Sequence, residues 1–112
     1  MQAHIEKNVH VGGEIINYIS SIVRATREHP KVALGASPRG SLSLLKASRA
    51  YAYVQGRQYV IPDDVRYFAA DCLNHRIMIK LDHEVEGVRA HSIIEEILAA
   101  VPVPRVKAPA GT

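Results

Sequence analysis

Aromatic residues, cysteine and long apolar runs are all scarce in this sequence of 112 residues. Only 5% of the residues are aromatic whereas 47% are apolar, so we expect a core of Ile, Val, Leu and Ala. The single cysteine, Cys72, excludes an internal disulfide and favours a reducing compartment. No apolar run approaches the roughly 20 residues that cross a bilayer, and no secretory leader is recognisable. These features predict one cytoplasmic domain without a membrane span.

Motifs that bind phosphate or metal are also missing. The sequence has no GxxxxGK(S/T) or GxGxxG loop and no CxxC or HExxH spacing. Its six histidines are dispersed, which argues against a metal site. Asp63 and Asp64 are adjacent, and successive helical residues point about 100° apart, so these carboxylates suit a helix dipole better than a catalytic pair. Cys72 lies on an apolar stripe, as a buried structural cysteine does. We therefore expect no catalysis, bound cofactor or metal in this chain alone.

The charge is mildly positive and spread along the chain. There are 14 Lys and Arg residues against 11 Asp and Glu residues, which gives a net charge of +3. A nucleic-acid module usually has a basic stripe with interleaved aromatic residues, and this sequence has neither. We expect a solvated surface and no nucleic-acid binding.

Apolar periodicity predicts four helices with short connections. The expected helices cover residues 13–28, 38–55, a segment starting at 62, and 90–100. Pro30 ends the first, because the residue before a proline is pushed out of the helical region. Residues 77–81 fit either a helical extension or a short β-strand. The predicted fold class is therefore all-α, a small bundle of about four helices, with a strand near 77–81 left open.

The second helix has the clearest start signal. Ser37 is a favourable N-cap, and Pro38 takes the first helical position, where its missing N–H costs nothing. Gly56 supplies a C-terminal stop. Apolar residues between Leu42 and Val54 cover most of the circumference, which predicts a largely buried helix. Its narrow polar edge consists of Arg39, Ser43, Lys46, Tyr53 and Arg57.

The two ends of the chain differ from this helical body. Residues 1–12 contain a short apolar alternation (Ile5, Val9 and Val11), and we expect a lead-in that packs against another part of the protein. Residues 102–112 are rich in proline and predict an extended tail. The helical body covers residues 13–101. In its last helix, Ser92 and Glu95 have the spacing of a capping box.

The segment Leu34–Gly40, with the sequence LGASPRG, is the strongest candidate for function. It places Arg39 in the first turn of a helix, where free N–H groups and the dipole already favour an anion. A guanidinium adds a permanent charge and donors that match phosphate oxygens. A cation here opposes the dipole and costs about 0.3–1 kcal/mol, which favours a functional role. Lys46 shares this helix face and is a second, weaker candidate.

The order of several motifs resembles the C-terminal lid of the MoxR family of AAA+ ATPases. The motifs are ATREHP at 25–30, LGASPR at 34–39, GRQYVIPDDV at 56–65, HR at 75–76 and VPVP at 101–104. The resemblance covers about residues 11–104, nearly the whole chain. GASPR followed by GRxYVxPDDV at this separation is a specific signature.

The resemblance implies a function that none of the patterns above establishes. Arg39 corresponds to a sensor-two arginine, which reaches from the lid to the terminal phosphate of ATP, with Ser37 and Pro38 beside it. ATP and Mg²⁺ would be bound by an upstream core domain. Family members typically form hexameric rings, act as chaperone-like remodelling ATPases, and often work with proteins that carry a von Willebrand factor A domain.

Two residues depart from the family pattern, since Gly40 and Ile61 stand where Ala and a capping Thr or Ser are expected. Ile61 would leave the third helix without a side-chain cap. Two alternatives to the lid remain open, namely a stand-alone helical adaptor module without nucleotide function and a small helical DNA-binding domain.

Overall fold

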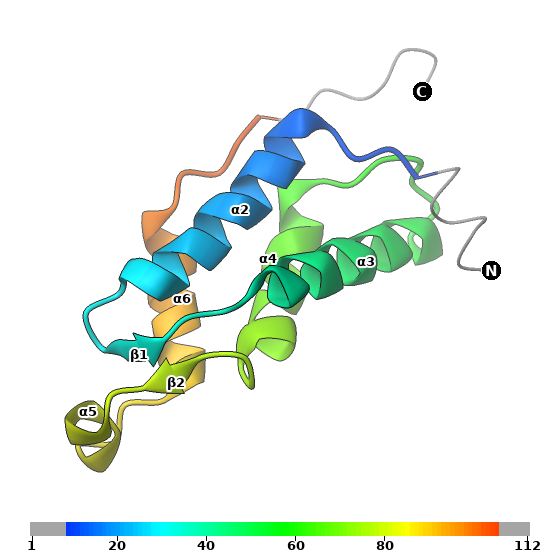
Figure 1. The fold of residues 1–112 in the computed structure, drawn as a ribbon. Coiled ribbons are helices and arrows are strands. Elements are labelled where there is room, and N and C mark those ends of the chain that lie inside the picture. Colours follow the sequence, from blue (N-terminus) through cyan, green and yellow to red (C-terminus); the bar gives the residue numbers. More distant parts are fainter. Residues whose placement is uncertain (1–8, 106–112) are drawn as a thin grey trace.

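The computed structural model describes residues 9–105. Its elements, in chain order, are α2 (Gly13–Glu28), β1 (Val32–Leu34), α3 (Pro38–Val54), α4 (Pro62–Leu73), β2 (Met78–Ile79), α5 (Leu81–Val85) and α6 (Ala90–Ala100). The longer helices pack together, with the strands and α5 at one end (Figure 1). The helical fold class is confirmed. Predictions for Ile5 in the lead-in and for residues 106–112 of the tail fall outside the described residues.

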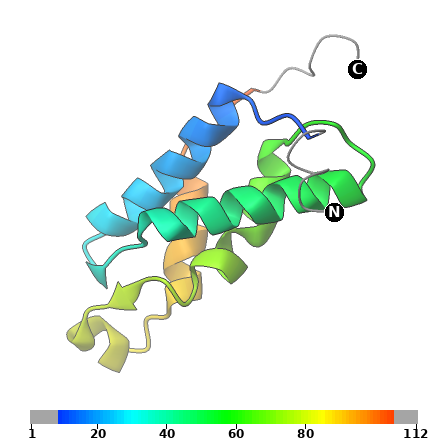
Figure 2. The same cartoon turned by 45° about the vertical axis from the view of Figure 1, so that its right-hand side comes forward.

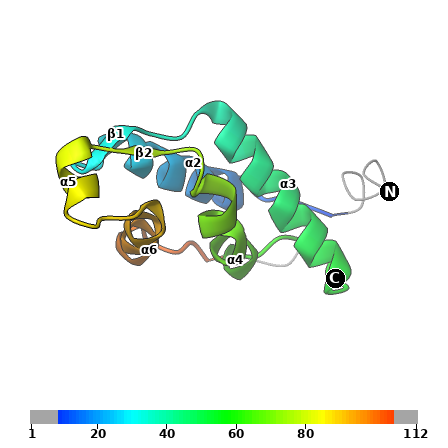
Figure 3. The same ribbon diagram turned by 90° about the horizontal axis from the view of Figure 1, so that it is seen from below.

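The longest helix of the described residues, α3, lies across the bundle (Figure 2). Figure 2 shows α3 crossing the bundle, and its main contacts are with α4. Seen from below, α5 and the two strands lie at one end and the C-terminal half of α3 lies at the other (Figure 3). Within residues 9–105, no helix has the length and apolar content needed to cross a bilayer.

The predicted helix boundaries are confirmed where a clear stop or start signal exists. Gly56, with φ 79°, follows the C-cap of α3. Its N–H donates to the Tyr53 carbonyl (3.0 Å), and the N–H of Arg57 donates to the Ala52 carbonyl (2.9 Å). These two bonds form a Schellman motif, which needs a left-handed residue and so favours glycine.

A single core fills the space between α2, α3, α4 and α6. The largest fully buried apolar side chains come from all four helices and include Ile15, Ile22, Leu44, Leu73, Ile93 and Ile94. The apolar pattern gave no role to Tyr18, which is also buried. Its hydroxyl accepts a hydrogen bond from Arg66 Nη1 (3.3 Å), so the phenol has a polar partner inside the bundle.

The lead-in contributes to this core. Val9 is only 3% exposed, and the next residue forms a parallel β-bridge with Tyr59. The His10 N–H donates to the Gln58 carbonyl (2.7 Å), and the Val60 N–H donates to the His10 carbonyl (3.0 Å). The chain that enters α2 is therefore fixed to the loop that precedes α4.

Residues 77–81, for which helix and strand were both open, contain a strand. β2 pairs antiparallel with β1, with Val32 opposite Ile79 and Leu34 opposite Met78. A strand as short as β1 has too few residues to show an alternating pattern, so the sequence did not reveal it. The short helix α5 follows β2 and ends before Gly87, which has φ 95°.

Two finer predictions are wrong. α3 is not largely buried, because only Gly40, Leu44, Ser48 and Ala52 are buried, while Leu42 is 50% and Val54 76% exposed. The helix lies on the surface of the bundle and buries a single stripe. Ser92 and Glu95 do not form a capping box, because α6 begins at Ala90 and its N-cap residue makes no side-chain capping bond.

Asp64 has a larger role than the expected interaction with the helix dipole. Its side chain is 1% exposed and forms an ion pair with Arg57 Nη2. Its other carboxylate oxygen accepts the Ile61 N–H (2.9 Å). Ile61 provides no side-chain cap, as predicted, and Asp64 satisfies the N-terminus of α4 from inside the helix. The ion pair also joins the end of α3 to the start of α4.

Candidate functional site

The candidate site is the N-terminal end of α3 and the loop before it. Ser37 has an extended backbone (φ −83°, ψ 173°), and Pro38 is the first helical residue, as predicted. The Ser37 side chain makes no capping hydrogen bond. Its carbonyl accepts the Gly40 N–H (2.9 Å), which closes the first turn. Ser37 and Pro38 are both exposed, so the helix end faces solvent.

Arg39 lies in this first turn with its side chain exposed. Its guanidinium makes no hydrogen bond or ion pair with any residue between 9 and 105. The first turn of α3 also contains no acidic residue. The site therefore combines an unpaired cation with the positive end of a helix dipole, and both attract an anion.

The face of α3 that carries Arg39 continues through Ser43 to Lys46. Ser43 Oγ accepts a hydrogen bond from Arg76 Nη2 (3.1 Å), and Arg76 Nε donates to the Cys72 carbonyl (3.0 Å). Lys46 is exposed and has no polar partner among residues 9–105. It lies seven residues beyond Arg39, a rise of about 10.5 Å along the helix. Sequence reasoning did not associate Arg76 with this face, because the contact joins α3 to the turn after α4.

The loop before Arg39 is held by the last turns of α2. The Ala36 N–H donates to Thr26 Oγ1 (3.0 Å), and the Ala36 carbonyl accepts from Arg27 Nε (2.9 Å). Gly35 lies so close to α2 that a Cβ at this position would be 2.6 Å from the Cα of Arg27. The sequence marked these residues only as parts of a family motif, since nothing local indicates that they meet.

A shallow apolar groove of about 240 Å³ lies beside the site, between α2 and α3. Its lining consists of Ile16, Ile19, Ser20, Pro38, Ser41, Leu42 and Leu45. Ile16 and Leu42 are about half exposed, at 48% and 50%. Pro38 and Leu42 flank Arg39 on the helix, so the cation and the apolar groove form one continuous surface.

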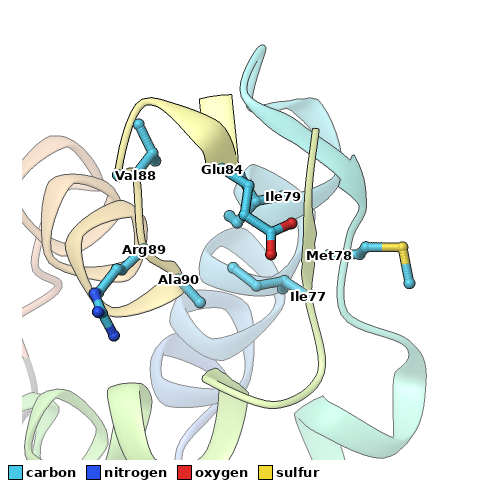
Figure 4. Close-up of a pocket in the computed structure, with 8 residues that line it drawn as sticks. Ile77, Met78, Ile79, Glu84, Val88, Arg89 and Ala90 are labelled. Atoms are coloured by element: carbon cyan, nitrogen blue, oxygen red, sulfur yellow. The ribbon is translucent and has the colours of Figure 1, made fainter. Parts of the chain in front are cut away.

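A larger open pocket of about 570 Å³ lies under β2 and the turn before α6 (Figure 4). Ile77 and Glu84 point into it, whereas Met78 and the guanidinium of Arg89 point away. The pocket therefore presents a single carboxylate among apolar side chains. None of the predicted site residues lines it.

Cys72 is partly buried in α4, close to its predicted environment. Burial, and to a lesser extent the nearby Asp71 carboxylate, raise the pKa of the Cys72 thiol above its ordinary value. A raised pKa lowers the thiolate fraction at neutral pH, which is the opposite of what a nucleophilic cysteine requires. Within residues 9–105, no group of three or more His, Cys, Asp or Glu side chains is placed to hold a metal ion.

The chain and its fold are similar to those of known proteins. A family model of the AAA lid domain matches residues 24–97, which is more than half of the chain. The chain belongs to the AAA lid domain family. The match includes the loop before α3, Arg39, and the start of α4.

The lid has relatives with a MoxR name. It is 35% identical over 113 residues to Chaperone MoxR1 of Mycobacterium tuberculosis, a match that covers 93% of this chain and 30% of that protein. It is 49% identical over 98 residues to YeaC, an uncharacterized protein of Bacillus subtilis, which covers 88% of this chain and 31% of YeaC. The resemblance to the MoxR lid is confirmed.

A solved structure shares the fold. The lid superposes on the crystal structure of a candidate ATPase from Cytophaga hutchinsonii with a TM-score of 0.86 and 32% sequence identity. The superposition covers 91% of this chain and 34% of the other. The lid thus spans about a third of the length of the relatives that it matches.

Proposed function

We propose that this lid contributes Arg39 to the terminal phosphate of ATP held by the core domain of a MoxR-like AAA+ ATPase, and so couples the state of the nucleotide to movement of the lid. The observation that carries the proposal is the exposed guanidinium in the first turn of α3, which has no polar partner among residues 9–105. Phosphoryl transfer depends mainly on positioning and charge stabilisation. A lid arginine can therefore affect the rate without covalent chemistry.

The residues present fit a phosphate and do not fit its metal. Arg39 offers forked donors, and the first turn of α3 offers its dipole, with Ser37 and Pro38 beside them. Mg²⁺ prefers carboxylate and water oxygens, and no acidic residue lies in this turn. The Mg²⁺ that accompanies ATP would accordingly be held by the core domain.

The groove next to Arg39 supports contact with a core domain. A protein that brings a phosphate to Arg39 must also approach Leu42, which lies one turn further along α3. Leu42 and Ile16 are apolar and half exposed, as expected of side chains that a second domain covers. Lys46, two turns from Arg39, would lie at the margin of the same contact.

The wider assembly follows from the relationship to MoxR proteins. We propose that the parent ATPase is cytoplasmic, forms a homo-oligomeric ring (a hexamer in the typical family member), and acts as a chaperone-like remodelling machine. A partner with a von Willebrand factor A domain belongs to the same proposal. One relative carries the name Chaperone MoxR1, which supports the chaperone-like role.

The decisive test is Arg39→Ala in the intact ATPase that contains this lid. A hydrogen bond to a charged group contributes about 1.5–3 kcal/mol, and 1.36 kcal/mol corresponds to tenfold in rate. We therefore expect kcat for ATP hydrolysis to fall roughly 10- to 150-fold. Arg24→Ala is the matched control, because Arg24 is also exposed but lies on α2. Unchanged turnover and nucleotide affinity in Arg39→Ala would refute the proposal.

The same experiment separates the lid from an adaptor without nucleotide function. The adaptor alternative is favoured by four apolar side chains near β1, β2 and α5 that are 60–79% exposed, namely Leu34, Met78, Leu81 and Val85. An adaptor would lose partner binding when these residues are changed and would be insensitive to Arg39→Ala. A MoxR-like lid would lose hydrolysis in Arg39→Ala.

A further inference from the structure

Both backbone polar groups of Ala36, three residues before Arg39, are held by α2. The Ala36 N–H donates to Thr26 Oγ1 (3.0 Å), and the Ala36 carbonyl accepts from Arg27 Nε (2.9 Å). Ala36 and Thr26 are both fully buried. Two consecutive side chains thus fix the peptide units on both sides of Ala36.

The orientation of the Thr26 hydroxyl is itself determined. Thr26 Oγ1 donates its only proton to the Val23 carbonyl (2.6 Å) within α2. The lone pairs of Thr26 Oγ1 therefore remain to accept a hydrogen bond. The Ala36 N–H donates to them. A buried threonine that bonds only within its own helix would not hold the loop in this way.

The loop also touches the backbone of α2 directly. At Gly35 a Cβ would lie 2.6 Å from the Cα and 2.7 Å from the N of Arg27. Such distances leave no room for a side chain between the loop and the helix. The loop before Arg39 is therefore held to α2 by two hydrogen bonds at Ala36 and by one backbone contact at Gly35.

The opposite side of the α3 start packs against α4 without hydrogen bonds to the loop before Arg39 among residues 9–105. Gly40 faces the side chains of Leu73 and Arg76 on or after α4, and Arg76 Nη2 donates to Ser43 Oγ in an exposed position. These contacts involve ends of flexible side chains. The hydrogen bonds that hold the loop before Arg39 in place are consequently those from α2.

We infer that Thr26 and Arg27 are positioning residues for Arg39, which make α2 and the start of α3 move as one rigid body. When α2 moves, the Arg39 guanidinium then moves with it, because the loop between them does not change shape. This inference rests on the proposed contact between Arg39 and ATP. It adds the route by which the lid controls that contact, with Ala36 as the connecting residue.

The test is a double-mutant cycle in the intact ATPase with Thr26→Val and Arg39→Ala. Thr26→Val keeps the side-chain shape and removes the acceptor, and misplacement of a reacting group by about 1 Å can cost up to 100-fold. We expect kcat to fall roughly 5- to 50-fold in Thr26→Val. In the Arg39→Ala background the same change should lower kcat less than about twofold, because the group being positioned is gone.

Two further variants keep the test independent of folding. Thr26→Ser retains the hydroxyl and should restore most of the activity. Arg27→Met removes the second donor to the Ala36 backbone from an exposed residue and should lower kcat at temperatures well below its Tm, where the variant remains folded.

Equal losses from Thr26→Val in both backgrounds would show a purely structural role and overturn the inference. Normal turnover in Thr26→Val, together with a loss in Arg39→Ala, would overturn the inference and leave the proposed function intact. Normal turnover in Arg39→Ala would overturn both.

Discussion

The close approach of Gly35 to α2 predicts that even a methyl group at this position destabilises the lid. An added Cβ would lie 2.6 Å from both the Cα and the Cγ of Arg27, and 2.7 Å from its N. Two of these three atoms belong to the helix backbone, which cannot move away by a side-chain rotation. Gly35 has no left-handed φ, so alanine is excluded by contact and not by conformation. Gly35→Ala must separate the loop from α2.

The size of the effect follows from what this separation breaks. Forcing an extra methyl group into a packed site costs about 1–3 kcal/mol. Separation also weakens two hydrogen bonds at Ala36, each contributing about 0.5–1.5 kcal/mol. The lower entropy of unfolded alanine offsets about 0.4–1 kcal/mol. We expect a net loss of about 2–4 kcal/mol, which lowers Tm by roughly 8–30 °C for a domain of this size.

Thermal unfolding of the 112-residue chain, followed by far-UV circular dichroism, measures this loss. Gly13→Ala is the matched control, because no atom lies within 4 Å of a Cβ there and its Tm should not fall. Gly40→Ala should lie between the two. Its Cβ would meet the flexible end of Leu73 at 3.1 Å, and the helix gains about 1 kcal/mol from alanine. A Tm for Gly35→Ala within roughly 2 °C of the wild type would refute the packing argument.

The remaining predictions concern α4. Asp64→Ala should reduce the free energy of unfolding in urea by about 3–5 kcal/mol, because it leaves the Arg57 guanidinium without its buried partner. The neighbouring exposed Asp63→Ala should cost less than about 1 kcal/mol, and equal losses in the two variants would contradict the role of the ion pair. Because its pKa is raised, the Cys72 thiol should react with iodoacetamide more slowly than a small free thiol at pH 8, and faster as the pH rises. Asp71→Asn should speed this labelling, and an unchanged rate would exclude the carboxylate as a cause.

Local signals were sufficient where one residue determines the outcome. Pro38 fixed the start of α3, Gly56 fixed its end, and Pro62 fixed the start of α4. In each case the signal acts through its own backbone conformation or a missing N–H, which does not depend on the rest of the fold. The exposed position of Arg39 at the helix start also followed from its place after Pro38.

Contacts between distant segments were beyond local reasoning. The burial of Asp64 depends on Arg57, and the support of the site depends on Thr26 and Arg27 meeting Ala36 across β1. A hydrogen bond between two segments that are far apart in the sequence does not alter the apolar periodicity of either segment. The burial of α3 was overestimated for the same reason, since an apolar pattern shows which residues can be buried and not how many helices are present to cover them.

The bridge between His10 and Tyr59 determines where a self-sufficient folding unit begins. The family match starts at residue 24, inside α2, and a chain cut there would lose Ile15, Tyr18, Ile19, Ile22 and Val23 from the core. A cut at Gly13 would preserve α2 but remove Val9, a burial that contributes about 1.5–3 kcal/mol. It would also leave the N–H of Val60 and the carbonyl of Gln58 without their partners. When lids are exchanged between related ATPases, the junction should therefore lie before Val9. The segment that pairs with Tyr59 is then transferred together with the helices that it connects.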